Sequence, residues 1–154
     1  MLRIHPTALA ELRAHAEEAY PHESCGVLLG TPTSEGWLVC AAVRAANTRT
    51  DSPQNRYEIA PDELVRILRS AREQGLDIAG FYHSHPDHPA EPSATDLAEA
   101  HWLQCSYVIT EVAHGRAIST ASFLLAGATE DDKRFDPEPI ELVEPAPLAP
   151  ASTF

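Results

Sequence analysis

A run of largely apolar residues, 76–82, leads directly into His83 and His85, and it limits the folds open to this chain. An apolar run of this length is typical of a strand buried within a sheet. Helical patterns stand on both sides of it, over residues 61–74 and from about 93 to about 104. A buried strand that alternates with helices predicts a mixed α/β fold, in which helices cover a sheet.

The remaining segments predict one more helix and five more strands. An apolar stripe at helical spacing runs over residues 9–19 and is ended by Pro21. The predicted strands cover residues 25–30, 37–43, 107–110, 118–125 and 140–143. The order αββαβαβββ predicts a single mixed α/β (α+β) domain with helices that flank a mainly antiparallel sheet. We expect this domain over residues 1–144, followed by a disordered Pro/Ala-rich tail over residues 145–154.

Charge and cysteine content limit the kinds of partner and the cellular compartment that we expect. The chain has 11 Lys and Arg against 23 Asp and Glu, and its net charge is −12. Such an acidic surface repels phosphate and anionic lipid, so we expect neither a nucleic-acid nor a membrane partner. The three cysteines are widely spaced and odd in number, which does not indicate a disulfide framework. Together with an N-terminus that lacks the apolar run of a signal peptide, this predicts a cytoplasmic protein.

His83 and His85 are candidate metal ligands. Side chains two residues apart on a strand point to the same face, and imidazole is a common zinc ligand. Asp96, in the first turn of the next predicted helix, is a candidate third ligand, which would leave the fourth tetrahedral position to water as in catalytic zinc sites. Each piece also has an ordinary explanation, a polar strand end for the histidines and a helix N-cap for Ser93 with Asp96. Their joint spacing arises by chance in about one sequence in a thousand.

Three other side chains near these motifs could belong to the site. Glu23, just before the strand at 25–30, is either a solvated loop charge or the base that a hydrolytic zinc site requires. Cys25 resembles a nucleophile, but a cysteine in a buried strand is usually a small apolar filler. His88 is either a spare ligand or a solvated loop residue. Trp102, on the helix expected over residues 93–104, would belong to the core or to an apolar edge.

The combined pattern resembles the signature of the JAMM (MPN+) zinc metalloproteases, over roughly residues 5–125. That signature is a distant Glu followed by His-x-His-x7-Ser-x2-Asp, which here is Glu23, His83, His85, Ser93 and Asp96. The resemblance implies a single MPN-like domain with a curved sheet, similar in architecture to cytidine deaminases. Members of the family cleave amide or isopeptide bonds at the C-terminus of ubiquitin or ubiquitin-like proteins. The compact chain resembles the small prokaryotic branch, some of whose members process sulfur-carrier proteins.

The resemblance also implies a role for each signature residue. His83, His85 and Asp96 would bind Zn²⁺, and Glu23 would move a proton from water to the leaving amine. Ser93 would donate a hydrogen bond to the oxyanion. A zinc ligand is a poor helix cap, so we expect Asp96 to leave the capping of its helix to Ser93 or to another group.

The expected activity is therefore that of a zinc metallopeptidase acting at the C-terminal Gly-Gly of ubiquitin-like or sulfur-carrier proteins. Two alternatives stay open, a zinc hydrolase of small peptides or amides and a non-catalytic MPN scaffold for protein interaction. The identity of the carrier and of the leaving amine is not encoded in these patterns. The oligomeric state is also open, a homodimer included.

Overall fold

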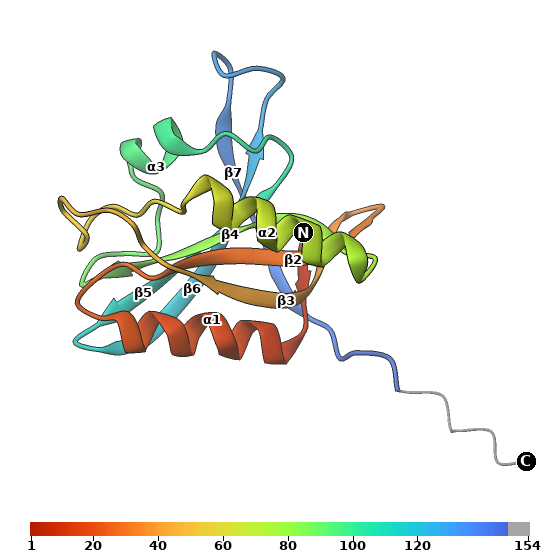
Figure 1. Cartoon of the computed structure of the whole chain (residues 1–154), viewed down its shortest axis with the longest axis horizontal. Coiled ribbons are helices and arrows are strands. Elements are labelled where there is room, and N and C mark those ends of the chain that lie inside the picture. Colours follow the sequence, from red (N-terminus) through yellow and green to blue (C-terminus); the bar gives the residue numbers. More distant parts are fainter. Residues whose placement is uncertain (148–154) are drawn as a thin grey trace, which may run out of the picture.

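The computed structural model describes residues 1–147, in which helices and strands alternate (Figure 1). The helices are α1 (Pro6–Ala19), α2 (Pro61–Glu73) and α3 (Ala94–Glu99). The strands are β1 (Leu2–Ile4), β2 (Cys25–Thr33), β3 (Gly36–Ala45), β4 (Asp77–Pro86), β5 (Ser106–Ala113), β6 (Arg116–Ala126), β7 (Arg134–Glu138) and β8 (Ile140–Leu142). Within residues 1–147, no helix is long and apolar enough to span a membrane. Most of the expected tail, residues 148–154, lies outside the described residues.

All eight strands belong to one sheet, in the order β7-β6-β5-β4-β2-β3-β1-β8. Four of the seven neighbouring pairs are antiparallel, whereas β4 pairs in parallel with β5, and β1 pairs in parallel with β3 and β8. Strands β7 and β8 are joined by Pro139 alone, although they lie at opposite ends of this order. The sheet therefore curls until its two ends meet, and the predicted mixed fold with a curved, mainly antiparallel sheet is confirmed.

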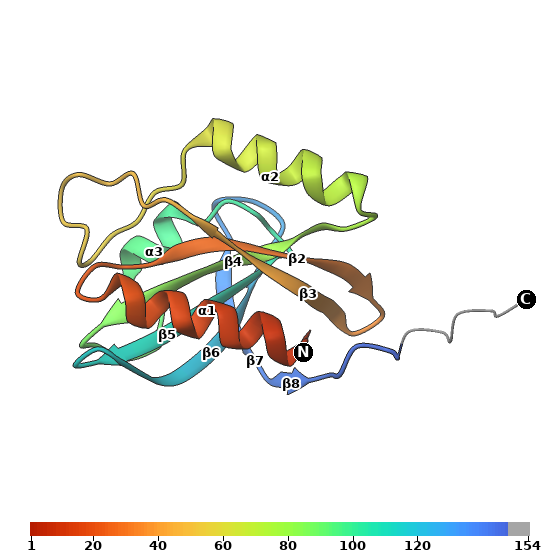
Figure 2. The ribbon, with the colours of Figure 1, turned by 60° about the horizontal axis from the view of Figure 1, so that its bottom comes forward.

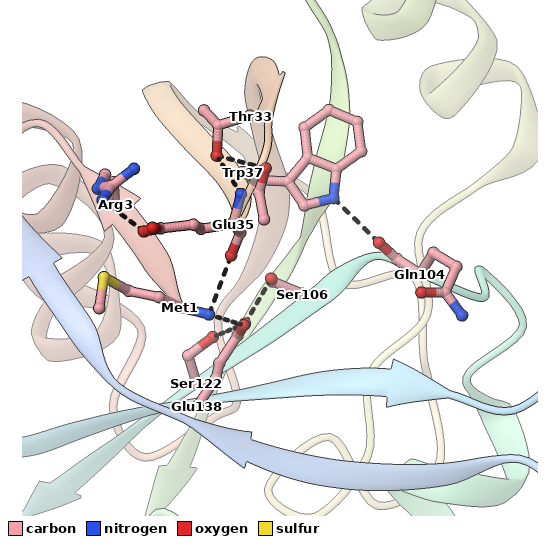
Figure 3. Close-up of polar contacts among 10 residues, drawn as sticks. Met1, Arg3, Thr33, Glu35, Trp37, Gln104, Ser106, Ser122 and Glu138 are labelled. Atoms are coloured by element: carbon pink, nitrogen blue, oxygen red, sulfur yellow. Dashed lines mark hydrogen bonds and ion pairs between the residues drawn. The ribbon is translucent and has the colours of Figure 1, made fainter.

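A buried carboxylate lies where the two ends of the sheet meet (Figure 3). Glu138 on β7 accepts hydrogen bonds from the hydroxyls of Ser106 (2.6 Å) and Ser122 (2.8 Å), which lie on β5 and β6. The amino group of Met1 pairs with the same carboxylate at 3.3 Å. Because this side chain is only 8% exposed, these donors stabilise a charge that burial would otherwise disfavour.

Helices α1 and α2 cover opposite faces of the sheet (Figure 2). Leu12 of α1 packs into a cluster with Leu28 and Val39 of the sheet. Ile67 of α2 packs into a separate cluster that contains Phe81. The two apolar stripes predicted from the sequence thus form two cores, one on each side of β4.

The third helix is shorter than the sequence predicts, because it ends at Glu99 rather than near Gln104. None of its six residues is buried, so no apolar stripe extends the helix. Beyond it, Gln104 adopts a left-handed conformation (φ 67°), which ends any regular helix. The expectation that Trp102 lies on this helix is therefore wrong. Its side chain lies in the connection to β5 and is 36% exposed.

Two strands that the sequence does not reveal complete the sheet. β1 has three residues and β7 has five, lengths at which hydrophobic alternation gives little signal. β7 also contains Pro137 and three charged residues, which disfavour a strand on propensity alone. Both form through long-range pairing, β1 with β3 and β7 with β6.

Candidate functional site

Strand β4 places His83 and His85 next to each other on one face of the sheet. His83 is paired with Cys25 of β2 on one side and with Ile109 of β5 on the other. Both imidazoles are about 2% exposed, and their Nε2 atoms lie 3.2 Å apart. β5 pairs with β4 at both positions, and β2 pairs with it as far as His83. This pairing leaves the two side chains little freedom, so the pair is held in place before any ligand arrives.

Asp96, at the start of α3, reaches both histidines. Its Oδ1 lies 3.3 Å from Nε2 of His83, and its Oδ2 lies 3.1 Å from Nε2 of His85. Oδ2 also accepts a hydrogen bond from the backbone of Ser93 (2.9 Å), while the Ser93 hydroxyl accepts one from the backbone of Asp96 (3.0 Å). Ser93 caps the helix, as expected, but Asp96 also takes part in capping, since it completes a capping box with Ser93 while it contacts both imidazoles.

The donor groups of these three residues lie close enough together to share one tetrahedral metal ion. Zinc holds such ligands at about 2.0–2.1 Å, so two ligands of a regular tetrahedron lie about 3.3–3.4 Å apart. The two Nε2 atoms are 3.2 Å apart, and each lies 3.1–3.3 Å from a different oxygen of the Asp96 carboxylate. In addition, His85 donates its Nδ1 hydrogen to the carbonyl of Pro89 (2.7 Å), so a neutral ring directs the lone pair of Nε2 toward the Asp96 carboxylate. A cation between these atoms would relieve their repulsion.

Glu23 lies beside this group, although it is 60 residues away from His83 in the sequence. Its side chain is 2% exposed, and one of its oxygens lies within 4.8 Å of a ring nitrogen of each histidine. Neither carboxylate oxygen has a hydrogen-bond partner in the described part of the chain. Burial, with a smaller contribution from the charges of Asp96 and Glu99, raises the pKa of Glu23 to about 9. Burying a carboxylate without a hydrogen-bond partner costs folding free energy. Buried groups with a strongly shifted pKa cluster at functional sites.

Ser84, the residue between the two histidines, ties the segment that carries Glu23 to β4. Its side chain points away from the imidazoles, and its Oγ accepts hydrogen bonds from the backbone N–H (2.8 Å) and the hydroxyl (3.1 Å) of Ser24. In the other direction, its own backbone N–H donates to the carbonyl of Ser24 (3.2 Å). The sequence analysis does not identify this contact, because nothing in the spacing shows that residue 24 lies beside residue 84.

Aromatic rings pack against the outer faces of both histidines. Tyr57, from the loop between β3 and α2, stacks on His83 with ring centroids 4.6 Å apart. His88 stacks on His85 at 4.1 Å and directs its Nδ1 to the carbonyl of Pro86. His88 is therefore a packing neighbour of the site rather than the spare ligand or solvated residue weighed above. Tyr57 carries no sequence signal that marks it as part of the site.

The pKa values of Asp96 and His83 are shifted in directions that suit metal binding. Burial alone would raise the pKa of Asp96, but its contact with the His83 imidazole and the hydrogen bond from the Ser93 N–H help to outweigh burial and hold that pKa below its usual range. Burial lowers the pKa of His83 despite the nearby carboxylate. At neutral pH these effects favour an ionised Asp96 and a neutral His83, the protonation states that a metal ion requires.

A cavity of about 400 Å³ shares one residue with this site. Tyr57 lines the cavity and also stacks on His83, whereas the signature residues themselves do not line it. The lining includes the apolar side chains of Phe81 and Trp102 and the charged side chain of Glu99. A partly apolar cavity of this kind can hold a ligand segment.

Comparison with known proteins identifies the family. The family model for prokaryotic homologs of the JAB domain matches residues 5–126. The chain belongs to this family. It is 38% identical over 112 residues to the desampylase of Haloferax volcanii, covering 70% of this chain and 78% of that protein. It is 26% identical over 133 residues to the CysO-cysteine peptidase of Mycobacterium bovis, covering 85% and 84%.

A solved structure supports the same assignment. The solution structure of a Desulfitobacterium hafniense protein superimposes with a TM-score of 0.79 at 30% sequence identity, covering 94% of each chain. The predicted family and the predicted class, a JAMM-type hydrolase, are therefore confirmed. The whole of the signature, from Glu23 to Asp96, falls within the segment that matches the JAB family.

Cys25 is the one side chain of this JAB domain that could be mistaken for a nucleophile. It is fully buried on β2, and burial raises the pKa of its thiol to about 12. At pH 8 such a thiol stays protonated, and the thiolate is the reactive form. These properties match those of the small apolar filler considered above.

We therefore predict that the thiols react in order of their exposure. At pH 8 the half-buried Cys40 should react first with a chromogenic disulfide reagent, whereas Cys25 and Cys105 should react only after unfolding in guanidinium. Cys25→Ala should leave hydrolysis within about threefold of the unmodified chain. Rapid labelling of Cys25 in the folded protein, or loss of hydrolysis in this variant, would contradict the assignment.

Proposed function

We propose that the chain is a zinc-dependent peptidase that hydrolyses amide or isopeptide bonds at the C-terminal Gly-Gly of ubiquitin-like or sulfur-carrier proteins. The observation that carries this proposal is the set of donor separations among His83, His85 and Asp96, next to the buried and unpaired carboxylate of Glu23. Two imidazoles and one carboxylate are the ligand set of a catalytic rather than a structural zinc site.

In this proposal His83, His85 and Asp96 hold the ion. Zinc, when bound, polarises a carbonyl and lowers the pKa of water. The chain itself supplies orientation, since Pro89 fixes the ring of His85 and the capping box fixes the carboxylate of Asp96. A rigid set of ligands lowers the cost of reorganisation during the reaction.

In this scheme Glu23 transfers the proton and Ser93 stabilises the oxyanion. Burial favours the protonated form of Glu23 at neutral pH in the metal-free chain, and the charge of a bound cation would favour the ionised form. The ionised Glu23 carboxylate would accept a proton from the attacking water and transfer it to the leaving amine, which departs neutral. Ser93 is exposed at the site, and its oxygen already accepts the N–H of Asp96, so its own hydrogen is free to donate. That hydrogen can stabilise the negative charge on the carbonyl oxygen of the tetrahedral intermediate.

The substrate class follows from the relatives and from the cavity. One relative is named for CysO and cysteine, and others are a desampylase and a conjugate-cleaving protease. A diglycine tail lets the peptide backbone approach a recessed metal site closely, since glycine has no side chain to obstruct it. The acidic chain, with a net charge of −12, favours carriers that present a neutral or basic face.

The proposal also includes the organisation and the location of the protein. Residues 1–144 would be the catalytic domain, and residues 145–154 an appended tail. We place the reaction in the cytoplasm, where cysteines stay reduced. All three cysteines are free thiols, in keeping with that compartment.

The first prediction from this proposal concerns metal content. The purified chain should bind one zinc ion, and both His85→Asn and Asp96→Asn should lose it. The loss of affinity should exceed the roughly 10–100-fold typical of removing an outer-shell partner. His101→Asn is the matched control, since this side chain is 63% exposed and contacts Glu130. Elemental analysis after dialysis gives the result, and a chain without stoichiometric zinc would favour the scaffold alternative.

The second prediction separates chemistry from metal binding. Glu23→Gln should keep its zinc and its melting temperature while its hydrolysis rate falls about 10²–10⁴-fold. Ser93→Ala should also keep zinc and lose about 10²–10³-fold. Rates from single-turnover assays, set beside the zinc content of each variant, decide the matter. A Glu23→Gln variant that turns over normally with zinc bound would remove Glu23 from the mechanism.

The third prediction concerns the substrate. Incubation of the zinc-loaded chain with a sulfur carrier joined through its diglycine terminus to cysteine should release the carrier with a free Gly-Gly end. Intact-mass spectrometry detects the loss of the cysteine, and Glu23→Gln serves as the inactive control. If such adducts stay intact while unrelated short peptides are cut, the alternative of a general peptidase is correct.

A further inference from the structure

Helix α3 carries Asp96 and has limited apolar anchoring. None of its six residues is fully buried, although half-buried Leu97 packs against the core and Ala100, directly after the helix, belongs to it. A helix of this length is unstable on its own in water, because few of its backbone hydrogen bonds close within the helix. Polar contacts therefore add to this small apolar contact in holding the helix against the rest of the domain.

Two of these contacts lie on the helix itself. At its N-terminus, Ser93 and Asp96 form the capping box described above. On its exposed side, Glu99 pairs with Arg56 from the loop between β3 and α2. Neither contact satisfies the carbonyl groups at the C-terminal end of the helix, which have no partner within it.

Lys133, in the turn between β6 and β7, supplies that partner. Its ammonium donates to the carbonyls of Ala98 (3.3 Å) and Ala100 (2.7 Å) at the end of α3. The same ammonium pairs with Glu130 at 2.6 Å, and its side chain is only 8% exposed. A cation at the C-terminal end of a helix is favourable both as a hydrogen-bond donor and toward the helix dipole.

The turn between β6 and β7 holds Lys133 in this position. Asp132 accepts hydrogen bonds from the backbone N–H groups of Ala128 (3.0 Å) and Thr129 (2.7 Å), which closes the turn tightly. Figure 1 shows this turn and α3 projecting from the same side of the sheet. The turn lies outside residues 5–126, the segment that matches the JAB family.

We infer that Lys133 is a positioning residue for the metal site, because it braces the helix that presents Asp96 to His83 and His85. The inference rests on the proposed function, in which Asp96 is a zinc ligand. Without the ammonium, the end of α3 would lose two hydrogen bonds, and the carboxylate would sample positions farther from the imidazoles. Lys133 itself does not touch the substrate or the reacting atoms.

The test compares substitutions at Lys133 with one at its neighbour. Lys133→Met keeps the length of the side chain but removes its charge and donors, and it should weaken zinc binding about 10–100-fold. Lys133→Arg should restore affinity to within a few-fold, since it keeps a cation that can donate to both carbonyls. The control is Arg134→Met, because Arg134 is 63% exposed and pairs with Asp136 rather than with α3. Affinity is measured by competition with a chromogenic chelator.

A second readout does not depend on zinc. Amide hydrogen exchange of the metal-free chain should accelerate at residues 96–100 in Lys133→Met and stay unchanged in Arg134→Met. Should Lys133→Met fail to fold, Glu130→Gln still removes the partner of the ammonium at an exposed position, and it should weaken zinc binding about two- to fivefold. Unchanged amide exchange and unchanged zinc affinity in these variants would overturn the inference that Lys133 holds α3 in place. Faster exchange in a chain that never binds zinc would keep the brace and reject the proposed metal function.

Discussion

The site depends on the way in which β4 is paired on both sides. Antiparallel β2 holds its backbone as far as His83 and parallel β5 as far as Pro86, so the side chains of His83 and His85 leave the sheet from a rigid frame. Core clusters on both faces of the sheet reinforce this frame. The Ser84 hydroxyl, on the opposite face, fixes the start of β2 and with it the buried Glu23. Three of the five signature residues are therefore positioned by one strand and its neighbour.

The other two signature residues are positioned differently. Ser93 and Asp96 lie at the start of a short helix that packs on the core through half-buried Leu97 and is otherwise held by polar contacts at its ends. The site thus joins a rigid half, provided by the sheet, to a half whose geometry depends on hydrogen bonds and ion pairs. Polar contacts of this kind are sensitive to a single missing partner, since an unpaired group loses its whole contribution.

Sequence patterns predict those elements whose formation depends mainly on residues close together in the chain. The stripe of α2, the pairing of β2 with β3 and the two histidines at the end of β4 all follow from spacing and turn residues. Glu23 is different, since only the family resemblance points to it and the fold must bring it to the histidines. Tyr57 and Ser84 give no local signal, because their roles come from contacts with residues distant in sequence. The short β1 and β7, and the early end of α3, are likewise set by tertiary contacts.

Lys133 is the only lysine among the 154 residues, and its ε-amine is turned inward against α3 and Glu130. The other basic side chains are arginines, whose guanidinium groups are not acceptors for ubiquitin-type conjugation, whereas lysine is its usual target. The chain thus offers a conjugating enzyme no freely exposed lysine on which to build an isopeptide bond.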